Sequence, residues 1–340
     1  MWGKVDGYDN YICMEFNGIP YRFDEETGAL ICYCSDPICD HMVTTCPFWG
    51  NSGNCIYYNN SIYYIKLQFD QKSKHDKMYV SYDIEDKELH QLRGGNFGYN
   101  ISTQVYYNNY CYFYEIDVDE ENGEWTVFLK RQNLDTYDIE LLETTAGFNT
   151  MILFGNEDKL YFVDNMFGVI YYTPVDDLTN KTIIYNSVTD EYMTDGENIF
   201  FIEYCKDGRR TISSIGYDGT NYKDYGLSNV WRYYVTNKYI YYMTDETCPI
   251  EIDDDTFTLT SRYLFRYDKE TQKSEKVLSF DDVLQTISIE RFIVCGNYLY
   301  ASFDFYSDGV SYNTCGNSII RIDIKSGDWY YIDPLKTTDG

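Results

Sequence analysis

The chain is poor in positive charge and lacks long apolar runs. Its 340 residues include 27 Lys and Arg against 55 Asp and Glu, which gives a formal net charge of −28. Nucleic acids and anionic membranes repel such a surface, because binding them depends on Lys and Arg that neutralise phosphates. No run approaches the 18 apolar residues that a transmembrane helix needs. We therefore expect no nucleic-acid partner and no transmembrane segment.

Familiar catalytic motifs are missing as well. The sequence holds no G-x-S-x-G, H-E-x-x-H or G-x-G-x-x-G element and no phosphate-binding glycine loop. Of its three histidines, His75 lies in a charged turn and His90 in an outer-strand pattern, so both are interpreted as surface residues. The sequence therefore predicts no catalytic residue.

Aromatic residues are abundant instead, with 39 Tyr and 19 Phe, and they favour strands over helices. One unit recurs seven times: a short loop with Asn, Asp or Gly is followed by an apolar and aromatic strand. The first apolar positions of these strands are spaced by 50, 49, 49, 39, 41 and 59 residues; they are residues 12, 62, 111, 160, 199, 240 and 299.

Each of these strands is surrounded by further strand patterns. Another strand usually precedes the core, and two more follow it around an acidic and polar turn, as at 262–278 and 318–332. Repeated units of four antiparallel strands indicate a β-propeller. We predict an all-β fold, a seven-bladed β-propeller that forms a single domain over residues 1–340. Because little sequence precedes Tyr11, six blades plus an irregular N-terminal segment is the alternative.

Two insertions fall between the second and third strands of the last units, at 244–261 and 305–317. Loops on a rigid scaffold are common binding sites, so the rim of the propeller is the expected binding surface. Trp49 or Trp231 could offer an aromatic face there to a sugar or a peptide.

A cysteine-rich connection between the first two blades covers residues 34–55. Cys34, Cys39, His41 and Cys46 follow the pattern C-x4-C-x-H-x4-C, a set of ligands that tetrahedral zinc prefers. These four residues are the predicted metal ligands, and structural zinc is the predicted cofactor. Two alternatives stay open. Cys34 or Cys39 could form a disulfide with Cys46 or Cys55, or the thiols could stay reduced without a metal.

Two acidic runs could hold calcium, although a solvated hairpin tip is the default interpretation of each. The runs are Asp117, Asp119 and Glu121, and Asp253, Asp254 and Asp255.

The segments DGENIFFIE, NNSIYYIK, YLFRYDKETQK and IIRIDIKSG resemble bacterial propellers of unknown function that are related to the YWTD propellers of low-density-lipoprotein-receptor-type proteins. The segment CSDPICDHMVTTCPFW is similar to a signature of exported proteins of gut-type Firmicutes. The N-terminus shows no signal pattern. The resemblance implies a propeller at the cell surface or outside a bacterium.

From these features we predict a non-catalytic ligand- or protein-binding or scaffold propeller of a bacterial cell surface, a monomer with a protein or glycan partner at its rim. A carbohydrate-active enzyme with carboxylate catalysis in the central funnel is the alternative.

Overall fold

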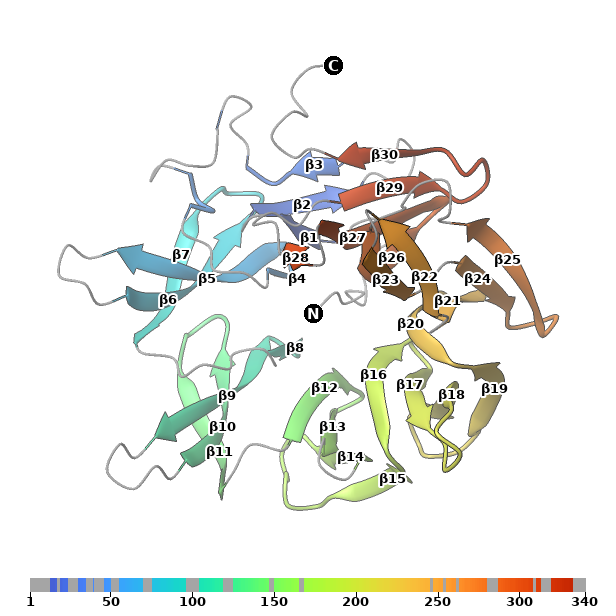
Figure 1. Ribbon diagram of the computed structural model, residues 1–340. Coiled ribbons are helices and arrows are strands. Elements are labelled where there is room, and N and C mark those ends of the chain that lie inside the picture. Colours follow the sequence, from blue (N-terminus) through green and yellow to red (C-terminus); the bar gives the residue numbers. More distant parts are fainter. Residues whose placement is uncertain are drawn as a thin grey trace. The chain divides into compact units, whose positions relative to one another are not determined.

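A computed structural model shows antiparallel β-sheets along the chain (Figure 1). The structure describes residues 13–16, 19–23, 30–34, 39, 46–49, 55–69, 75–95, 104–118, 125–146, 150–164, 168–244, 247–252, 255–260, 263–279, 287–307, 310–312 and 319–332. The chain divides into two compact units. One consists mainly of Gly50–Tyr192 and Ile215–Tyr222, and the other of Trp2–Trp49, Met193–Ser214 and Lys223–Gly340.

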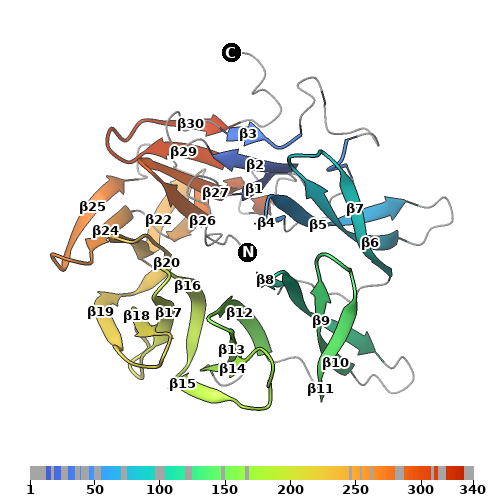
Figure 2. The same cartoon turned by 180° about the vertical axis from the view of Figure 1, so that it is seen from behind.

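The first unit holds three sheets whose four strands follow one another in chain order (Figure 2). They comprise β4 (Ile56–Tyr58), β5 (Ser61–Phe69), β6 (His75–Asp83) and β7 (Leu89–Gly95); β8 (Val105–Tyr107), β9 (Tyr110–Val118), β10 (Trp125–Asn133) and β11 (Ile139–Ala146); and β12 (Thr150–Asn156), β13 (Lys159–Asp164), β14 (Val169–Pro174) and β15 (Thr182–Asn186).

The remaining sheets belong wholly or mostly to the second unit. They comprise β1 (Cys13–Phe16), β2 (Ile19–Phe23) and β3 (Leu30–Cys32); β16 (Thr189–Thr194), β17 (Asn198–Tyr204), β18 (Arg210–Gly216) and β19 (Lys223–Ser228); β20 (Val230–Val235), β21 (Tyr239–Thr244), β24 (Tyr263–Asp268) and β25 (Lys273–Ser279); and β26 (Ile287–Cys295), β27 (Tyr298–Ser307), β29 (Ile319–Asp323) and β30 (Trp329–Ile332).

The predicted insertions lie where the sequence places them, between second and third strands. In the first, β22 (Thr247–Ile252) and β23 (Asp255–Thr260) form a hairpin of their own between β21 and β24. In the second, β28 (Val310–Tyr312) pairs with β27.

The predicted count of seven four-stranded units is wrong. Within the described ranges six sheets have a four-stranded core, whereas the N-terminal sheet has only the three strands β1–β3. The alternative of six blades plus an irregular N-terminal segment matches this count of six. In this sheet the described pairing joins only β1 with β2 and β2 with β3, and Met1–Ile12 lies outside the described residues.

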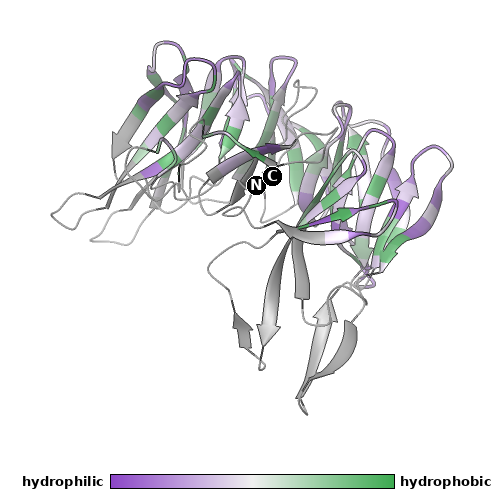
Figure 3. Ribbon diagram, turned by 90° about the horizontal axis from the view of Figure 1, so that it is seen from above, coloured by the Kyte–Doolittle hydropathy of each residue, from purple (hydrophilic) through white to green (hydrophobic). Residues whose placement is uncertain are grey.

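The second strand of each four-stranded sheet is the core of that sheet. In β13 the consecutive residues Leu160–Val163 are all buried, and so are Ile199–Ile202 in β17 and Ile240–Met243 in β21. Successive side chains of a strand point to opposite faces, so burial of four in a row means that both faces are covered. In Figure 3 hydrophobic colour lies along the strands and hydrophilic colour at the hairpin turns.

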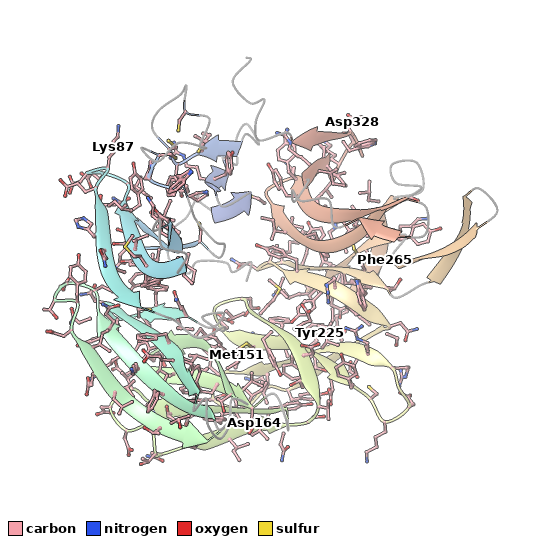
Figure 4. The ribbon with its side chains drawn as sticks, turned by 60° about the vertical axis from the view of Figure 1, so that its left-hand side comes forward. Lys87, Met151, Asp164, Tyr225, Phe265 and Asp328 are labelled. Carbon is pink, nitrogen blue, oxygen red and sulfur yellow. The ribbon has the colours of Figure 1, made fainter. Side chains whose placement is uncertain are left out.

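At one edge of each four-stranded sheet, meaning the end of its strands where the first-to-second and third-to-fourth turns lie, these two turns are side by side. Three turns between first and second strands have two successive residues with positive φ, as type I′ hairpins require; they are Asn59-Asn60, Asn108-Asn109 and Glu157-Asp158. Most turns between third and fourth strands also contain a residue with positive φ; Lys87, labelled in Figure 4, is an example, and the turn between β14 and β15 is an exception. In five sheets an amide of the second turn donates to a carbonyl of the first: Ile84 to Asn60, Leu134 to Asn109, Val175 to Asp158, Lys269 to Lys238 and Ile324 to Asn297.

Tyrosine hydroxyls connect neighbouring sheets at this edge. The amide of Asn109 donates to the hydroxyl of Tyr58 (3.1 Å), and the amide of Asp158 donates to the hydroxyl of Tyr107 (2.9 Å). Both bonds span 51 residues, so they follow the sequence repeat. Gly155 makes room for the second bond, because a Cβ there would come within 2.7 Å of the Cβ of Tyr107.

The change Gly155→Ala should lower the free energy of unfolding by roughly 1–3 kcal/mol, because the added methyl group overpacks the contact with the Tyr107 ring. Urea unfolding measures the loss. In a Tyr107→Gly background the same methyl group meets neither the ring nor the Cβ of residue 107, so its penalty should shrink sharply. An equal penalty in both backgrounds would show that this contact is not the cause.

A largely buried ion pair connects two sheets of the second unit. The Nζ of Lys269 donates to a carboxylate oxygen of Asp195 at 2.7 Å, and the two side chains are only 15% and 12% exposed. Burial alone would raise the pKa of Asp195. The bond from Lys269 and the amides of Asn198 and Glu197 outweigh burial, and they hold that pKa below its usual value.

This pair should stabilise the fold above the ordinary aspartate pKa, and its contribution should be lost as the pH falls through the lowered pKa of the folded state. Asp195→Asn leaves Lys269 partly buried without its counter-charge, which costs up to roughly 3–5 kcal/mol at neutral pH. Urea midpoints of wild type and variant should converge as the pH is lowered below about 4. A difference in urea midpoint that stays the same at all pH values would show that the charge of Asp195 is not its cause.

Candidate functional site

The cysteine-rich connection brings three thiols together. Each of Cys34, Cys39 and Cys46 offers one sulfur atom, and the three sulfurs all lie within 4.8 Å of one another. Cys34 follows the end of β3 by two residues, and Cys46 begins a turn closed by a bond from the Trp49 amide to the Cys46 carbonyl (3.2 Å). The structure thus groups three of the four predicted ligands, while His41 lies outside the described residues.

A fourth thiol, missed as a candidate by the sequence analysis, borders the cluster. The amide of Cys34 donates to the sulfur of Cys32 at 3.3 Å. Burial raises the pKa of Cys32 to about 12, and the charges of Cys34 and Cys39 add to this effect. Burial likewise raises the pKa of Cys46 to about 12, although the amide of Phe48 opposes the shift. Both groups are therefore neutral thiols at pH 7 unless a cation favours the thiolate.

This arrangement suits a soft cation. Clustered thiolates select zinc over hard cations such as calcium or magnesium. The sulfurs of Cys34 and Cys46 are 4.0 Å apart, about twice the length of a disulfide bond. Metal binding and the two alternatives stay predictions.

A second cluster, of arginine and aromatic side chains, lies at the other edge of the sheet β16–β19, where β17 ends and β20 begins. The guanidinium of Arg210 lies over the rings of Tyr204 (5.5 Å) and Trp231 (5.2 Å), and that of Arg232 lies 4.6 Å from the Trp231 ring centroid. The register of β20 against β21 shifts between Val230 and Arg232, so Trp231 occupies a bulge. Bulges commonly redirect a side chain. We call Tyr204, Arg210, Trp231 and Arg232 the Arg–Trp cluster.

Arg210 carries an unused donor in this cluster. Its Nε is buried, and no described atom accepts a hydrogen bond from it. The neighbouring Arg209 differs, because its Nε donates to the carboxylate of Asp207 at 2.7 Å. Tyr204 is 39% exposed, so the cluster includes an accessible aromatic face. Guanidinium donors beside aromatic rings suit a ring-shaped ligand that carries a carboxylate.

Sequence reasoning named Trp231 as a candidate rim aromatic but missed both arginines. The dipeptide Arg209-Arg210 in a turn was the available signal, but it does not show which of the two reaches the ring. Trp49 ends the turn that begins at Cys46. A role of Trp49 in ligand binding stays a prediction.

Apart from the three thiols, the described residues hold no further group of possible metal ligands. His90 is on β7, with a partly exposed side chain 4.0 Å from Glu88. His75 begins β6, Asp117 lies in β9 and Asp255 begins β23, and their side chains are not among those described. The remaining calcium candidates lie outside the described residues; they are Asp119, Glu121, Asp253 and Asp254.

Several solved structures of low sequence identity share this architecture. An oligogalacturonate lyase from Vibrio parahaemolyticus is 11% identical, with a TM-score of 0.58 over 88% of this chain and 85% of that chain. The β-propeller domain of the Trilobed protease from Pyrococcus furiosus is 10% identical, with a TM-score of 0.52 over 82% of each chain. An acylaminoacyl peptidase from Pyrococcus horikoshii is 11% identical, with a TM-score of 0.54 over 86% of this chain and 47% of that chain.

At such identities the match shows the fold alone. Together with the four-stranded antiparallel sheets, it defines the chain as an all-β propeller. No protein-family model and no curated protein matches the sequence. The resemblance to YWTD propellers and to Firmicutes surface proteins therefore gains no support beyond the fold. The described residues include no helix long and apolar enough to cross a membrane.

The prediction of a non-catalytic binding or scaffold module is contradicted. The similar structures include a lyase and peptidases, so this propeller resembles those that enzymes contain. The second interpretation of the sequence, a carbohydrate-active enzyme, agrees better with these neighbours.

Proposed function

We propose that this propeller is a carbohydrate-active enzyme that cleaves an acidic saccharide bound at the Arg–Trp cluster. The observation that carries the proposal is the placement of two guanidinium groups over Trp231, beside the exposed ring of Tyr204. Two neighbouring guanidinium groups contrast with a chain that has 27 basic and 55 acidic residues. The cluster therefore supports a ligand with negative charge.

One of the similar structures is an enzyme whose name gives a saccharide as its substrate. This chain matches 85% of the oligogalacturonate lyase, whose name gives an acidic oligosaccharide as its substrate, but 47% of the acylaminoacyl peptidase. A match to nearly the whole lyase means that the propeller accounts for most of that enzyme. It accounts for about half of the peptidase.

The cluster would favour cleavage by elimination. In such a reaction a base removes the proton beside the sugar carboxylate, the bond to the departing sugar oxygen breaks, a carbon–carbon double bond forms, and the departing oxygen takes up a proton. Arg210 and Arg232 on the carboxylate would stabilise the negative charge that develops there, while an aromatic ring stacks on the sugar. Catalysis by a carboxylate in the central funnel, which the sequence suggested, stays a prediction.

The matched pair Arg210→Gln and Arg209→Gln tests the proposal. Hydrogen bonds to charged groups contribute roughly 1.5–3 kcal/mol, so Arg210→Gln should weaken the binding of oligogalacturonate about 10- to 100-fold. Arg209→Gln should bind as wild type does, because Arg209 pairs with Asp207 on the same turn. Titration calorimetry measures binding, and ultraviolet absorbance of the new double bond measures cleavage.

A neutral oligosaccharide of the same length serves as the ligand control, and it should bind weakly to all three proteins. Equal affinity for the neutral and the acidic saccharide would contradict the proposed specificity. Equal losses in Arg209→Gln and Arg210→Gln would show that the general charge of this edge, and not the Arg–Trp cluster, determines binding. Release of reducing ends without the ultraviolet signal would replace elimination by hydrolysis.

A further inference from the structure

The three thiols of the cysteine-rich connection form a site that is independent of the Arg–Trp cluster. They converge from a segment of 13 residues, Cys34 to Cys46. Acidic side chains are the usual members of chance clusters on a chain with 55 Asp and Glu, yet this cluster consists of cysteines alone. The high number of acidic residues therefore does not explain why three thiols, which are ligands for soft metal ions, lie together.

The surroundings of the thiols are those of a structural site. Cys46 and Phe48 are each 2% exposed, so the turn at residues 46–49 is anchored in the protein. The amide of Phe48 bonds to the sulfur of Cys46. Amide donors to sulfur stabilise thiolates, and a closed set of thiolates holds zinc in sites that maintain a fold.

We propose that Cys34, Cys39 and Cys46 bind one zinc ion that fixes the connection between β3 and β4. Zinc bound by thiolates would stabilise this segment directly, because such a site forms only in the folded chain. His41 stays the ligand predicted from the sequence for the fourth position. Cys32 lies beside the centre and is not one of its ligands.

Metal analysis of the full-length protein, purified without chelator, tests the assignment. We expect about one zinc per chain in the wild type, loss of that zinc in Cys39→Ser, and retention in Cys32→Ser, the matched control from the same connection. Zinc retained in Cys39→Ser, or lost equally in both variants, would overturn the assignment. His41→Gln should lower zinc affinity; unchanged affinity would remove His41 from the site.

Cobalt substitution gives a readout that does not depend on how well the variants fold. Co²⁺ added to the zinc-free wild type should give the strong ultraviolet charge-transfer absorption of thiolate ligands and should raise the unfolding temperature. A disulfide between Cys34 and Cys46, found by peptide mapping of the freshly purified protein, would overturn the proposal. Absence of the charge-transfer absorption would overturn it as well. The saccharide proposal is tested with variants of Arg209 and Arg210, and the zinc proposal with variants of the cysteines. Either proposal can therefore fail without the other.

Discussion

The structure depends on covering both faces of each sheet's second strand. The runs Leu160–Val163 and Ile199–Ile202 are buried on successive residues, and full burial of one such side chain contributes roughly 1.5–3 kcal/mol. A single four-stranded sheet cannot bury both of its faces, so each repeat is stable only against its neighbours. Aromatic side chains suit this role because they fill the space between sheets, as the stacked rings of Phe162 and Tyr171 do.

The two edges of the sheets then serve different purposes. Where first-to-second and third-to-fourth turns meet, hydrogen bonds between the turns recur from sheet to sheet, for example from Ile84 to Asn60. Such an edge leaves little freedom for insertions. The opposite edge carries the second-to-third turns and the connections between sheets. It accepts the hairpin β22–β23, the Arg–Trp cluster and the thiols after β3, so the variable chemistry collects where the turns are not fixed.

The strands and the thiol cluster were predictable because the residues that define them lie close together in the sequence. An apolar run after an Asn- or Asp-containing turn fixes a second strand, as at Asn109 and Cys111, because turn and strand lie in adjacent residues. The thiol cluster was predictable for the same reason, since its members span 13 residues. The number of four-stranded sheets was not, because the repeat pattern at β1–β3 resembles the others although only three strands pair there in the described residues. The contact of Arg210 with Trp231 joins residues that are 21 positions apart and depends on a bulge that no motif announces.

The net charge of −28 and an acidic ligand are compatible because the two effects act over different distances. Exposed charges are screened beyond about 8 Å at physiological ionic strength, so the distant carboxylates mainly slow the encounter. Within the Arg–Trp cluster, the partly buried guanidinium of Arg210 acts at hydrogen-bond distance, where screening is weak. Added salt should therefore speed association and weaken the final contact. The proposed binding of an acidic saccharide would gain selectivity in this way, since an anion that lacks the shape of the cluster would meet only repulsion.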